Sequence, residues 1–407
     1  MVLSSAAVTV SPTAVARRSN RPVLAVFLDG LGADAVARMP FLASQTTVRR
    51  MRTELGYSIT CHASMYTGLR PDRHLLWFVW QRRPEASPFR WLRPFRFLNA
   101  IDNLPMHVIA TKITRRFVRT TSWFGIPYPV HVPWRYIPDL DVAERKLWPE
   151  PGYLAPATTI FDDMRAAGIP FEIVGLARGR SMGLAAIEAW TPPERPAPFT
   201  YLFAGDIDHA SHAHGQDSAE VTELLLRVDR AIERQLHALG SPALVVWSDH
   251  GHHDVRRLNP LTFLAEHRFD IRRWPHVIDT NFIRLWIADA GERREVVERL
   301  DALGIGHVLT DSELERHRVK MPDDRYGNVI FYLELPWAFS HTIWGFGRRL
   351  ASAHGYLPDH PGSDAVLVSD LPAGEGPFDL VDVAPSLLEL LGLSAAPGID
   401  GRSVWNR

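Results

Sequence analysis

The sequence lacks the features that would point to a secreted, membrane-spanning or nucleic-acid-binding protein. Its 407 residues include one cysteine, Cys61, so no disulfide forms within the chain, as a reducing compartment allows. No apolar run approaches the roughly 20 residues that a membrane-spanning helix needs. The 45 basic and 46 acidic residues nearly cancel, so the overall charge indicates neither a nucleic-acid nor a membrane partner. From these absences we expect a cytoplasmic protein.

The first 20 residues also lack the pattern of a secretory signal peptide. No basic residue precedes their apolar stretch, and Ser, Thr and Pro interrupt it. We therefore expect residues 1–20 to be a flexible tail. The whole chain is 46% hydrophobic and 22% charged, which is typical of globular proteins and not of disordered ones.

Buried strands alternate with amphipathic helices along much of the chain. Residues 22–28 form a continuous apolar run, as a parallel strand buried on both faces requires. Similar runs lie at 171–175, 198–203, 243–248 and 365–369, and helical patterns cover 158–167 and 218–239. This alternation predicts an α/β fold with a mostly parallel central sheet and helices on both faces.

Two segments interrupt the alternation. Residues from about 75 to 150 are dense in Trp, Phe, Pro and Arg and have no clean period. Residues 255–330 contain a strand, a helix and a second strand, which predicts a small inserted α+β cap. We therefore predict a catalytic core built from residues 21–254 and 331–407, with the aromatic and basic insert inside it and the cap at 255–330.

Side chains that bind metal ions follow several of the predicted strands. Asp29 ends the first strand, and Asp208 with His212 and Asp249 with His250 follow two later strands. A fourth candidate, His354, precedes the apolar run at 365–369. Strand ends converge on one edge of an open sheet, and Asp and His are ligands of divalent metals such as zinc. Asp206 is the closest rival to Asp208. His209, His214, His252 and His253 flank the expected ligands, and we expect them to support the site or face solvent.

Ser58 precedes a predicted helix that runs through Met65 and ends at Gly68. One interpretation is a loop followed by an ordinary helix. The other makes Ser58 a nucleophile, because a helix N-terminus favours an alkoxide and an anionic phosphoryl group. Thr60 is the second candidate for the nucleophile and ranks behind Ser58.

Together these motifs resemble the alkaline phosphatase superfamily, in particular its type I phosphodiesterase/nucleotide pyrophosphatase branch. The runs that carry the resemblance, in the family's order, are Asp29-Gly30, Ser58, Thr67 to His74, Asp208 with His212 and Gly215, Asp249-His250-Gly251, His354-Gly355-Tyr356, Val381 to Leu388, and Asp400 to Ser403. The resemblance implies an alkaline phosphatase-like fold and two divalent metal ions, Zn²⁺ or alternatively Mn²⁺. By the resemblance, Asp208, His212 and His354 hold one ion. Asp29, Asp249, His250 and the oxygen of Ser58 hold the other.

The sequence departs from the family pattern at two positions. The family's phosphodiesterases have an Asn about twenty residues after the nucleophile, and none stands near Val79 here, so Gln81 or Arg82 is the expected substitute as substrate contact. Cys61 replaces the family's Asn before His62; we interpret it as a small buried residue, since the Cys-x-Pro-x-Arg context of a sulfatase is missing. The insert has two interpretations: a lid over a base or an acyl chain, or a local satellite core.

The resemblance and the ligand pattern predict a metal-dependent hydrolase of phosphoric esters. We expect a small-molecule substrate with a phosphodiester or pyrophosphate bond and a phosphoseryl intermediate on Ser58. The alternatives are a phosphomonoesterase or phosphonate hydrolase on the same core, or a non-catalytic binding protein that retains the fold. Loss of a ligand or of the nucleophile would favour the last, and the sequence retains them all.

Overall fold

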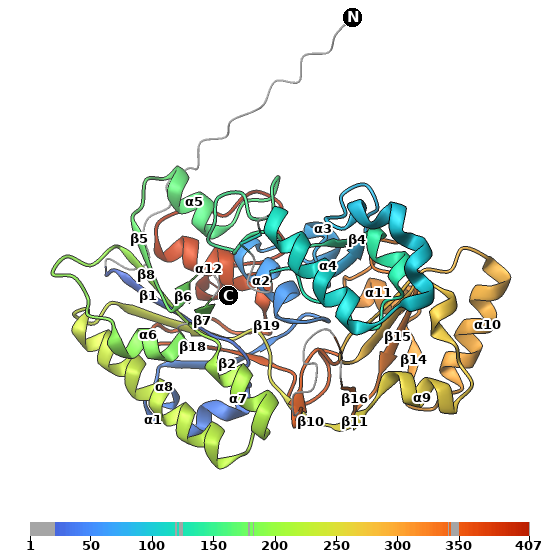
Figure 1. The fold of residues 1–407 in the computed structure, drawn as a ribbon. Helices are drawn as coiled ribbons and strands as arrows, with labels where there is room; N and C mark the ends of the chain where they lie inside the picture. The colour runs from blue at the N-terminus through green and yellow to red at the C-terminus, as the bar shows by residue number, and fades with distance from the viewer. Residues whose placement is uncertain are drawn as a thin grey trace, which may run out of the picture.

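The computed structural model describes residues 21–118, 120–121, 125–177, 180–181, 183–340, 342 and 350–406, so the predicted tail at 1–20 lies outside the described residues. Its centre is a seven-stranded sheet of order β19-β2-β18-β9-β1-β8-β5 (Figure 1). These strands are β1 (Val23–Leu28), β2 (Thr47–Arg52), β5 (Phe171–Val174), β8 (Phe199–Ala204), β9 (Ala243–Trp247), β18 (Ala365–Ser369) and β19 (Phe378–Asp379). Only β18 runs antiparallel to its neighbours β9 and β2. The predicted α/β fold with a mostly parallel sheet is confirmed.

The central strand β1 is buried on both faces. Val23, Ala25 and Phe27 belong to one hydrophobic core, whereas Leu24 and Val26 belong to another on the opposite face. Successive side chains of a strand point to opposite faces, so both sets must be apolar. The continuous apolar run therefore reflects two cores that share one sheet.

Helices cover each face of this sheet. One core packs α2 (Ser58–Thr67), α5 (Ile160–Ala166) and α12 (Val383–Leu390) against the sheet, above it in Figure 1. The other core packs α1 (Pro40–Ala43), α6 (Gly183–Ala189), α7 (Asp206–His214), α8 (Ala219–Ala238) and the 3₁₀ helix η1 (Ala33–Arg38), below it. The predicted helices at 158–167 and 218–239 are α5 and α8. No helix in the described part of the chain has the length and hydropathy needed to span a membrane.

A second, antiparallel sheet lies beside the first, in the order β12-β13-β15-β14. Its strands and helices are β12 (His276–Ile278), β13 (Phe282–Leu285), β14 (Gly306–Val308), β15 (Val329–Leu333), α9 (Pro260–Glu266), α10 (Ala290–Asp301) and α11 (Asp311–Arg316). One face packs on α9 and α10, and the other packs on the aromatic insert. The last residue of this sheet is Leu333, three residues beyond the predicted end of the cap. The division of residues 255–330 into a separate cap stays a prediction.

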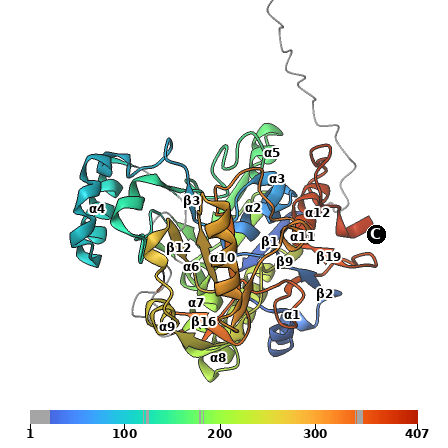
Figure 2. The same ribbon diagram turned by 90° about the vertical axis from the view of Figure 1, so that its right-hand side faces the viewer.

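The insert joins the second sheet through buried aromatic and basic side chains. The short helix α3 (Pro71–His74) precedes it, and its own elements are β3 (Trp80–Arg82), η2 (Arg90–Ile101), α4 (Leu104–Phe117), η3 (Trp134–Asp139) and β4 (Leu140–Val142). Nη1 of Arg284, on β13, donates to the carbonyl of Trp80 at 2.8 Å, and its guanidinium lies 4.1 Å from the ring centre of Phe78. Figure 2 shows α4 at the outer edge of the molecule, away from the central sheet.

Short elements complete the described chain. They are β6 (Leu176–Ala177), β7 (Arg180–Ser181), β10 (His253–Asp254), β11 (Arg256–Leu258), β16 (Trp337–Phe339), β17 (Ser352–Ala353), η4 (Ile271–Arg273), η5 (Leu380–Asp382) and η6 (Val404–Asn406). The pairing of β10 with β17 matters for the site, because it joins the segment after His252 to the segment before His354.

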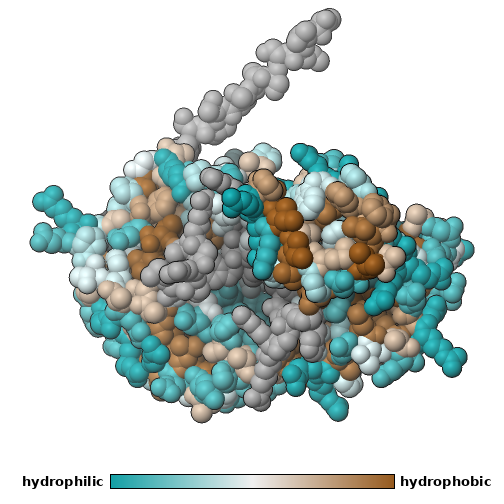
Figure 3. All heavy atoms as spheres, in the orientation of Figure 1, coloured by the Kyte–Doolittle hydropathy of each residue, from teal (hydrophilic) through white to brown (hydrophobic). Residues whose placement is uncertain are grey.

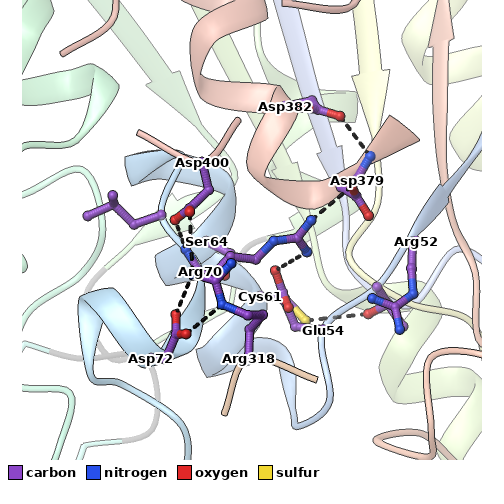
Figure 4. Close-up of polar contacts among 12 residues, drawn as sticks. Arg52, Glu54, Cys61, Ser64, Arg70, Asp72, Arg318, Asp379, Asp382 and Asp400 are labelled. Carbon is purple, nitrogen blue, oxygen red and sulfur yellow. Dashed lines mark hydrogen bonds and ion pairs between the residues drawn. The ribbon is translucent and has the colours of Figure 1, made fainter. Parts of the chain in front are cut away.

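Ion pairs around Arg70 hold the C-terminal side of α2 in place (Figure 4). The Arg70 guanidinium lies 3.1 Å from Glu54 and 2.8 Å from Asp379, which joins the segment before α2 to the C-terminal region. Glu54 is buried, which raises its pKa, and Arg70 opposes that rise. A second pair, Arg318 with Asp72, is more exposed and connects the α11 segment to α3.

Candidate active site: an Asp and His cluster beside a serine

The predicted metal ligands gather at the carboxyl edge of the central sheet. Asp29 follows β1, and Asp249 and His250 lie just beyond β9, which is a direct neighbour of β1. The strand on the other side, β8, leads into α7, which carries Asp208 and His212. Backbone contacts connect these loops: the amide of Gly30 donates to Oδ1 of Asp249 at 3.0 Å. The parallel register of the strands therefore brings distant parts of the chain to one place.

The first group of ligands is Asp29, Asp249 and His250, all of them buried. Nε2 of His250 lies 3.1 Å from Oδ2 of Asp249 and 3.7 Å from Oδ1 of Asp29. One ligand atom from each of the three residues lies within 4.8 Å of those of the other two. These atoms are close enough to share a single ion.

The second group adjoins the first and centres on Asp208. Its Oδ1 lies 3.3 Å from Nε2 of His212, one helical turn away on α7, and 3.6 Å from Nε2 of His354. The rings of His354 and His250 stack with centroids 3.7 Å apart, so the two groups are contiguous. All six predicted Asp and His ligands thus lie in one cluster. Which ion each residue holds stays a prediction.

His252 lies closer to this cluster than its sequence position suggested. Its Nε2 lies 3.1 Å from Oδ1 of Asp208, and its Nδ1 lies 3.1 Å from Oγ of Ser352. Asp208, His212 and His252 also form a compact set of possible ligands. One signal was present in the sequence: His252 stands two residues after His250. In the structure Gly251, between them, packs against the backbone of Gly362.

The other flanking residues point elsewhere. The side chain of Asp206 accepts a hydrogen bond from the backbone amide of Leu184 at 2.8 Å, which favours Asp208 over this rival. His209 and His214 are exposed. His253 lies 2.9 Å from the hydroxyl of Ser363. None of these four belongs to a group of potential ligands among the described residues.

Ser58 is the first residue of α2 and faces the first ligand group. Its Oγ lies 3.1 Å from Nε2 of His250 and 3.5 Å from Oδ1 of Asp29, and the residue is 5% exposed. Thr60 is fully buried, and its hydroxyl donates to the carbonyl of Trp77. Since Thr60 faces the protein interior, the geometry favours Ser58 as nucleophile. The helix ends at Thr67 and is capped by Gly68 in the left-handed conformation, as predicted.

The charges of the cluster fit divalent cations. The pKa of Asp29 lies well above its ordinary value, because burial disfavours the carboxylate and Asp249 and Asp208 repel it. Oδ2 of Asp249 is buried and lies 3.1 Å from Nε2 of His250, outside good hydrogen-bond geometry. Burial also lowers the pKa of His252 to about 4, which leaves its imidazole neutral. The pKa of His212 and that of His250 are raised instead, because Asp208 and Asp249 outweigh the effect of burial. Crowded carboxylates beside imidazoles are a donor set that suits divalent metal ions.

The two predicted substrate contacts, Gln81 and Arg82, have no described contact with the Asp and His cluster. Nε2 of Gln81, on β3, donates to Oδ2 of Asp141 at 3.0 Å, so its amide already has a partner in the insert. Nε of Arg82 is buried without a hydrogen-bond partner among the described residues. No described contact joins either side chain to Ser58, so their role in substrate binding stays a prediction. Cys61 is fully buried, as predicted, and burial raises the pKa of its thiol.

Comparisons with known proteins agree with this arrangement. A model of the type I phosphodiesterase / nucleotide pyrophosphatase family matches residues 23–357. No curated protein sequence matches the chain. Murine ectonucleotide pyrophosphatase / phosphodiesterase 5 has a similar structure, with 17% identity and a TM-score of 0.64 over 93% of this chain and 96% of that one. The human protein has 16% identity and a TM-score of 0.65, over 95% and 98%.

A third similar structure contains a nucleotide. It is an inactive threonine-to-alanine variant of the murine protein in complex with AMP, with 17% identity and a TM-score of 0.65, over 93% of this chain and 96% of that one. At these identities the structures establish a shared fold.

Proposed function

This chain belongs to the type I phosphodiesterase/nucleotide pyrophosphatase family, and from that premise we propose that it hydrolyses phosphodiester or pyrophosphate bonds by way of a phosphoseryl intermediate on Ser58. It is an enzyme of this hydrolase type, as the family match over residues 23–357 establishes. The observation that carries the proposed mechanism is the position of Ser58 Oγ, 3.1 Å from His250 and 3.5 Å from Asp29.

Ser58 attacks the phosphorus atom of the substrate in line with the leaving group. A P–O bond forms at Ser58 Oγ, the bond to the leaving alcohol or phosphate breaks, and the proton of the Ser58 hydroxyl ends on the departing oxygen. Water then cleaves the phosphoserine and restores the hydroxyl. Because Ser58 begins α2, the N-terminal end of that helix favours the negative charge of the phosphoryl group.

We assign two divalent cations to the cluster, one to Asp208, His212 and His354, and the other to Asp29, Asp249, His250 and Ser58. When bound, such ions lower the pKa of an attacking hydroxyl and neutralise phosphoryl charge. Zinc is the favoured metal and manganese the alternative, because three imidazoles and three carboxylates form the donor set. The repulsion that Asp249 and Asp208 exert on Asp29 supports the presence of cations in this cluster.

The substrate we propose is a small phosphoric diester or pyrophosphate, such as a nucleotide derivative. The AMP bound by the murine relative supports a nucleotide. The family's Asn is missing here, and we propose Arg82 in its place, since the buried Nε of Arg82 lacks a partner in the described chain. Arg82→Met is expected to lower kcat and kcat/KM together, and a change in KM alone would exclude a role at the transition state.

A substrate panel tests the function. Purified protein is stripped of metal, reloaded with zinc or manganese, and assayed with nitrophenyl phosphate mono- and diesters, dinucleoside pyrophosphates and a phosphonate ester. We expect the highest kcat/KM among the diesters or pyrophosphates, and no turnover without metal. A higher kcat/KM for the monoester or the phosphonate than for every diester and pyrophosphate would overturn the proposed bond type. We also propose a cytoplasmic location, which the single buried cysteine supports.

A further inference from the structure

The exposed hydrophobic side chains of this protein are concentrated in one short segment of the insert. Within the described residues, the large apolar side chains that are exposed are Trp91, Phe95, Phe97, Ile101, Ile109, Ile113 and Phe117. All seven fall on η2 and α4, and Phe97 and Phe117 are 73% and 79% exposed. Figure 3 shows hydrophobic side chains gathered over this part of the surface. Such a patch usually marks a binding surface.

The helix α4 turns its apolar side outward. Ile109, Ile113 and Phe117 are spaced four residues apart, so they form one stripe along the helix, and all three are exposed. The buried side of the same helix carries His107, Ala110, Thr111 and Thr114. An amphipathic helix in a globular protein normally buries its large apolar residues. The exposure of this apolar stripe indicates that α4 contacts another molecule through it.

Positive charge accompanies the stripe. Residues 90–117 contain six basic residues and one acidic residue, although the whole chain is balanced. The one acid, Asp102, is bonded to Nε2 of His107 at 2.6 Å and to the amide of Trp134 at 3.0 Å. Lys112 and Arg116 lie next to the stripe, are exposed, and form no ion pair within the described chain. The patch is therefore apolar and cationic at once.

The two helical segments form one surface. Nε1 of Trp91, on η2, donates to Oγ1 of Thr114 on the buried side of α4 at 3.1 Å. Nε1 of Trp134 donates to the carbonyl of Phe95 at 2.9 Å, which ties η2 to the following 3₁₀ helix, η3. Since α4 lies at the outer edge of the molecule in Figure 2, a broad flat partner can reach the surface.

We propose that η2 and α4 dock this enzyme onto the interface of an anionic phospholipid bilayer. A helix that presents Ile and Phe beside Lys and Arg has the composition of segments that lie in the interfacial region, with the apolar side chains inserted and the basic ones at the headgroups. A second copy of the chain fits this surface less well, because a symmetric dimer would bring its basic residues against each other. The inference does not depend on the proposed reaction.

Vesicle binding of the full chain tests the proposal. We expect the protein to sediment with vesicles of phosphatidylcholine mixed with phosphatidylglycerol and to be released by salt, and to bind phosphatidylcholine alone weakly. The triple variant Ile109→Ser, Ile113→Ser, Phe117→Ser is expected to lose at least about a hundredfold in affinity. Its hydrolysis of a soluble diester and its thermal unfolding are expected to stay unchanged, since these side chains face solvent.

Two double variants with the same change in net charge distinguish the effect of the charges on α4 from the effect of the total charge of the protein. Lys112→Glu with Arg116→Glu is expected to weaken binding to the anionic vesicles by about fivefold or more for each residue. Arg293→Glu with Arg294→Glu, on α10, changes the net charge equally and is expected to leave binding intact. Equal loss in both pairs, no vesicle binding at all, or full binding by the triple serine variant would overturn the proposal. So would a dimer that the serine variant dissociates, because a second copy would then cover the patch.

Discussion

Ser58 and Thr60 offer a sharp test of the active site, because they lie two residues apart on one helix and face different surroundings. Ser58→Ala removes an oxygen that lies 3.1 Å from His250 at the ligand cluster. Thr60→Ala removes a hydroxyl that donates to the carbonyl of Trp77 in the protein interior. Both changes delete a hydroxyl, and Thr60→Ala also deletes a buried methyl group. Each variant is therefore a control for the other in turnover.

The expected effects on activity and stability run in opposite order. Loss of the nucleophile costs about 10⁶ in kcat in a well-studied serine hydrolase, so we expect Ser58→Ala to lower kcat by at least about 10⁴, or about 5 kcal/mol of barrier. Its effect on stability is limited to one hydrogen bond, about 0.5–1.5 kcal/mol. Thr60→Ala leaves the buried carbonyl of Trp77 without its donor and is expected to cost about 1–3 kcal/mol of stability while most turnover remains.

Three measurements on each variant decide the matter: kcat with a nitrophenyl diester, metal content, and the free energy of unfolding in urea. The reasoning is refuted if Ser58→Ala keeps more than a tenth of the wild-type kcat with full metal content. It is also refuted if Thr60→Ala abolishes turnover while its unfolding and metal content match the wild type, which would move the nucleophile to Thr60.

Other predictions concern the metals and the ion pairs. Removal of the metals with a chelator is expected to lower the unfolding temperature, and zinc is expected to restore it, since an ion that binds only the folded state at 100 times its Kd adds about 2.7 kcal/mol; an unchanged transition would speak against bound metal. His252→Ala is expected to weaken metal binding by about ten- to a hundredfold in a competition titration, because His252 contacts a ligand carboxylate, and unaltered affinity would limit it to packing. Arg70→Met leaves the buried carboxylate of Glu54 unpaired and is expected to cost about 3–5 kcal/mol in urea unfolding. Arg318→Met, which breaks the more exposed pair with Asp72, is the control and is expected to cost no more than about 1 kcal/mol; equal losses would contradict the burial argument.

The vesicle experiment also tests the expectation, drawn from the overall charge of the sequence, that the protein has no membrane partner. A net charge of −1 gives no indication of a membrane partner. That total conceals a strongly basic segment at residues 90–117, because acidic residues elsewhere compensate for it. The aromatic content of the insert likewise does not indicate which side chains are exposed. Trp77, Phe78 and Trp80 are buried, whereas Phe95 and Phe97 are exposed. Composition cannot separate these two sets, since burial depends on what the rest of the chain packs against them.

The sequence by itself determined the fold class, the main strands and the ligand types. Each buried parallel strand had to be a continuous apolar run, and Asp29, Asp249 and His250 follow such runs where the strands end. The helix that begins at Ser58 and its glycine cap were equally local. The six Asp and His side chains that the structure brings into one cluster were therefore selected from the sequence alone, and their role as ligands stays a prediction.

Only the tertiary structure decided which side chain faces which neighbour. Asp206 and Asp208 are two residues apart on one helix, and their directions depend on α6 and on the loop after β9. His252 reaches Asp208 because the pairing of β10 with β17 sets the path of the following chain. Thr60 points inward because Trp77, seventeen residues away, supplies an acceptor. Local sequence sets the periodicity of each element, but the partners of a side chain come from distant segments, and their approach is fixed only when the whole core packs.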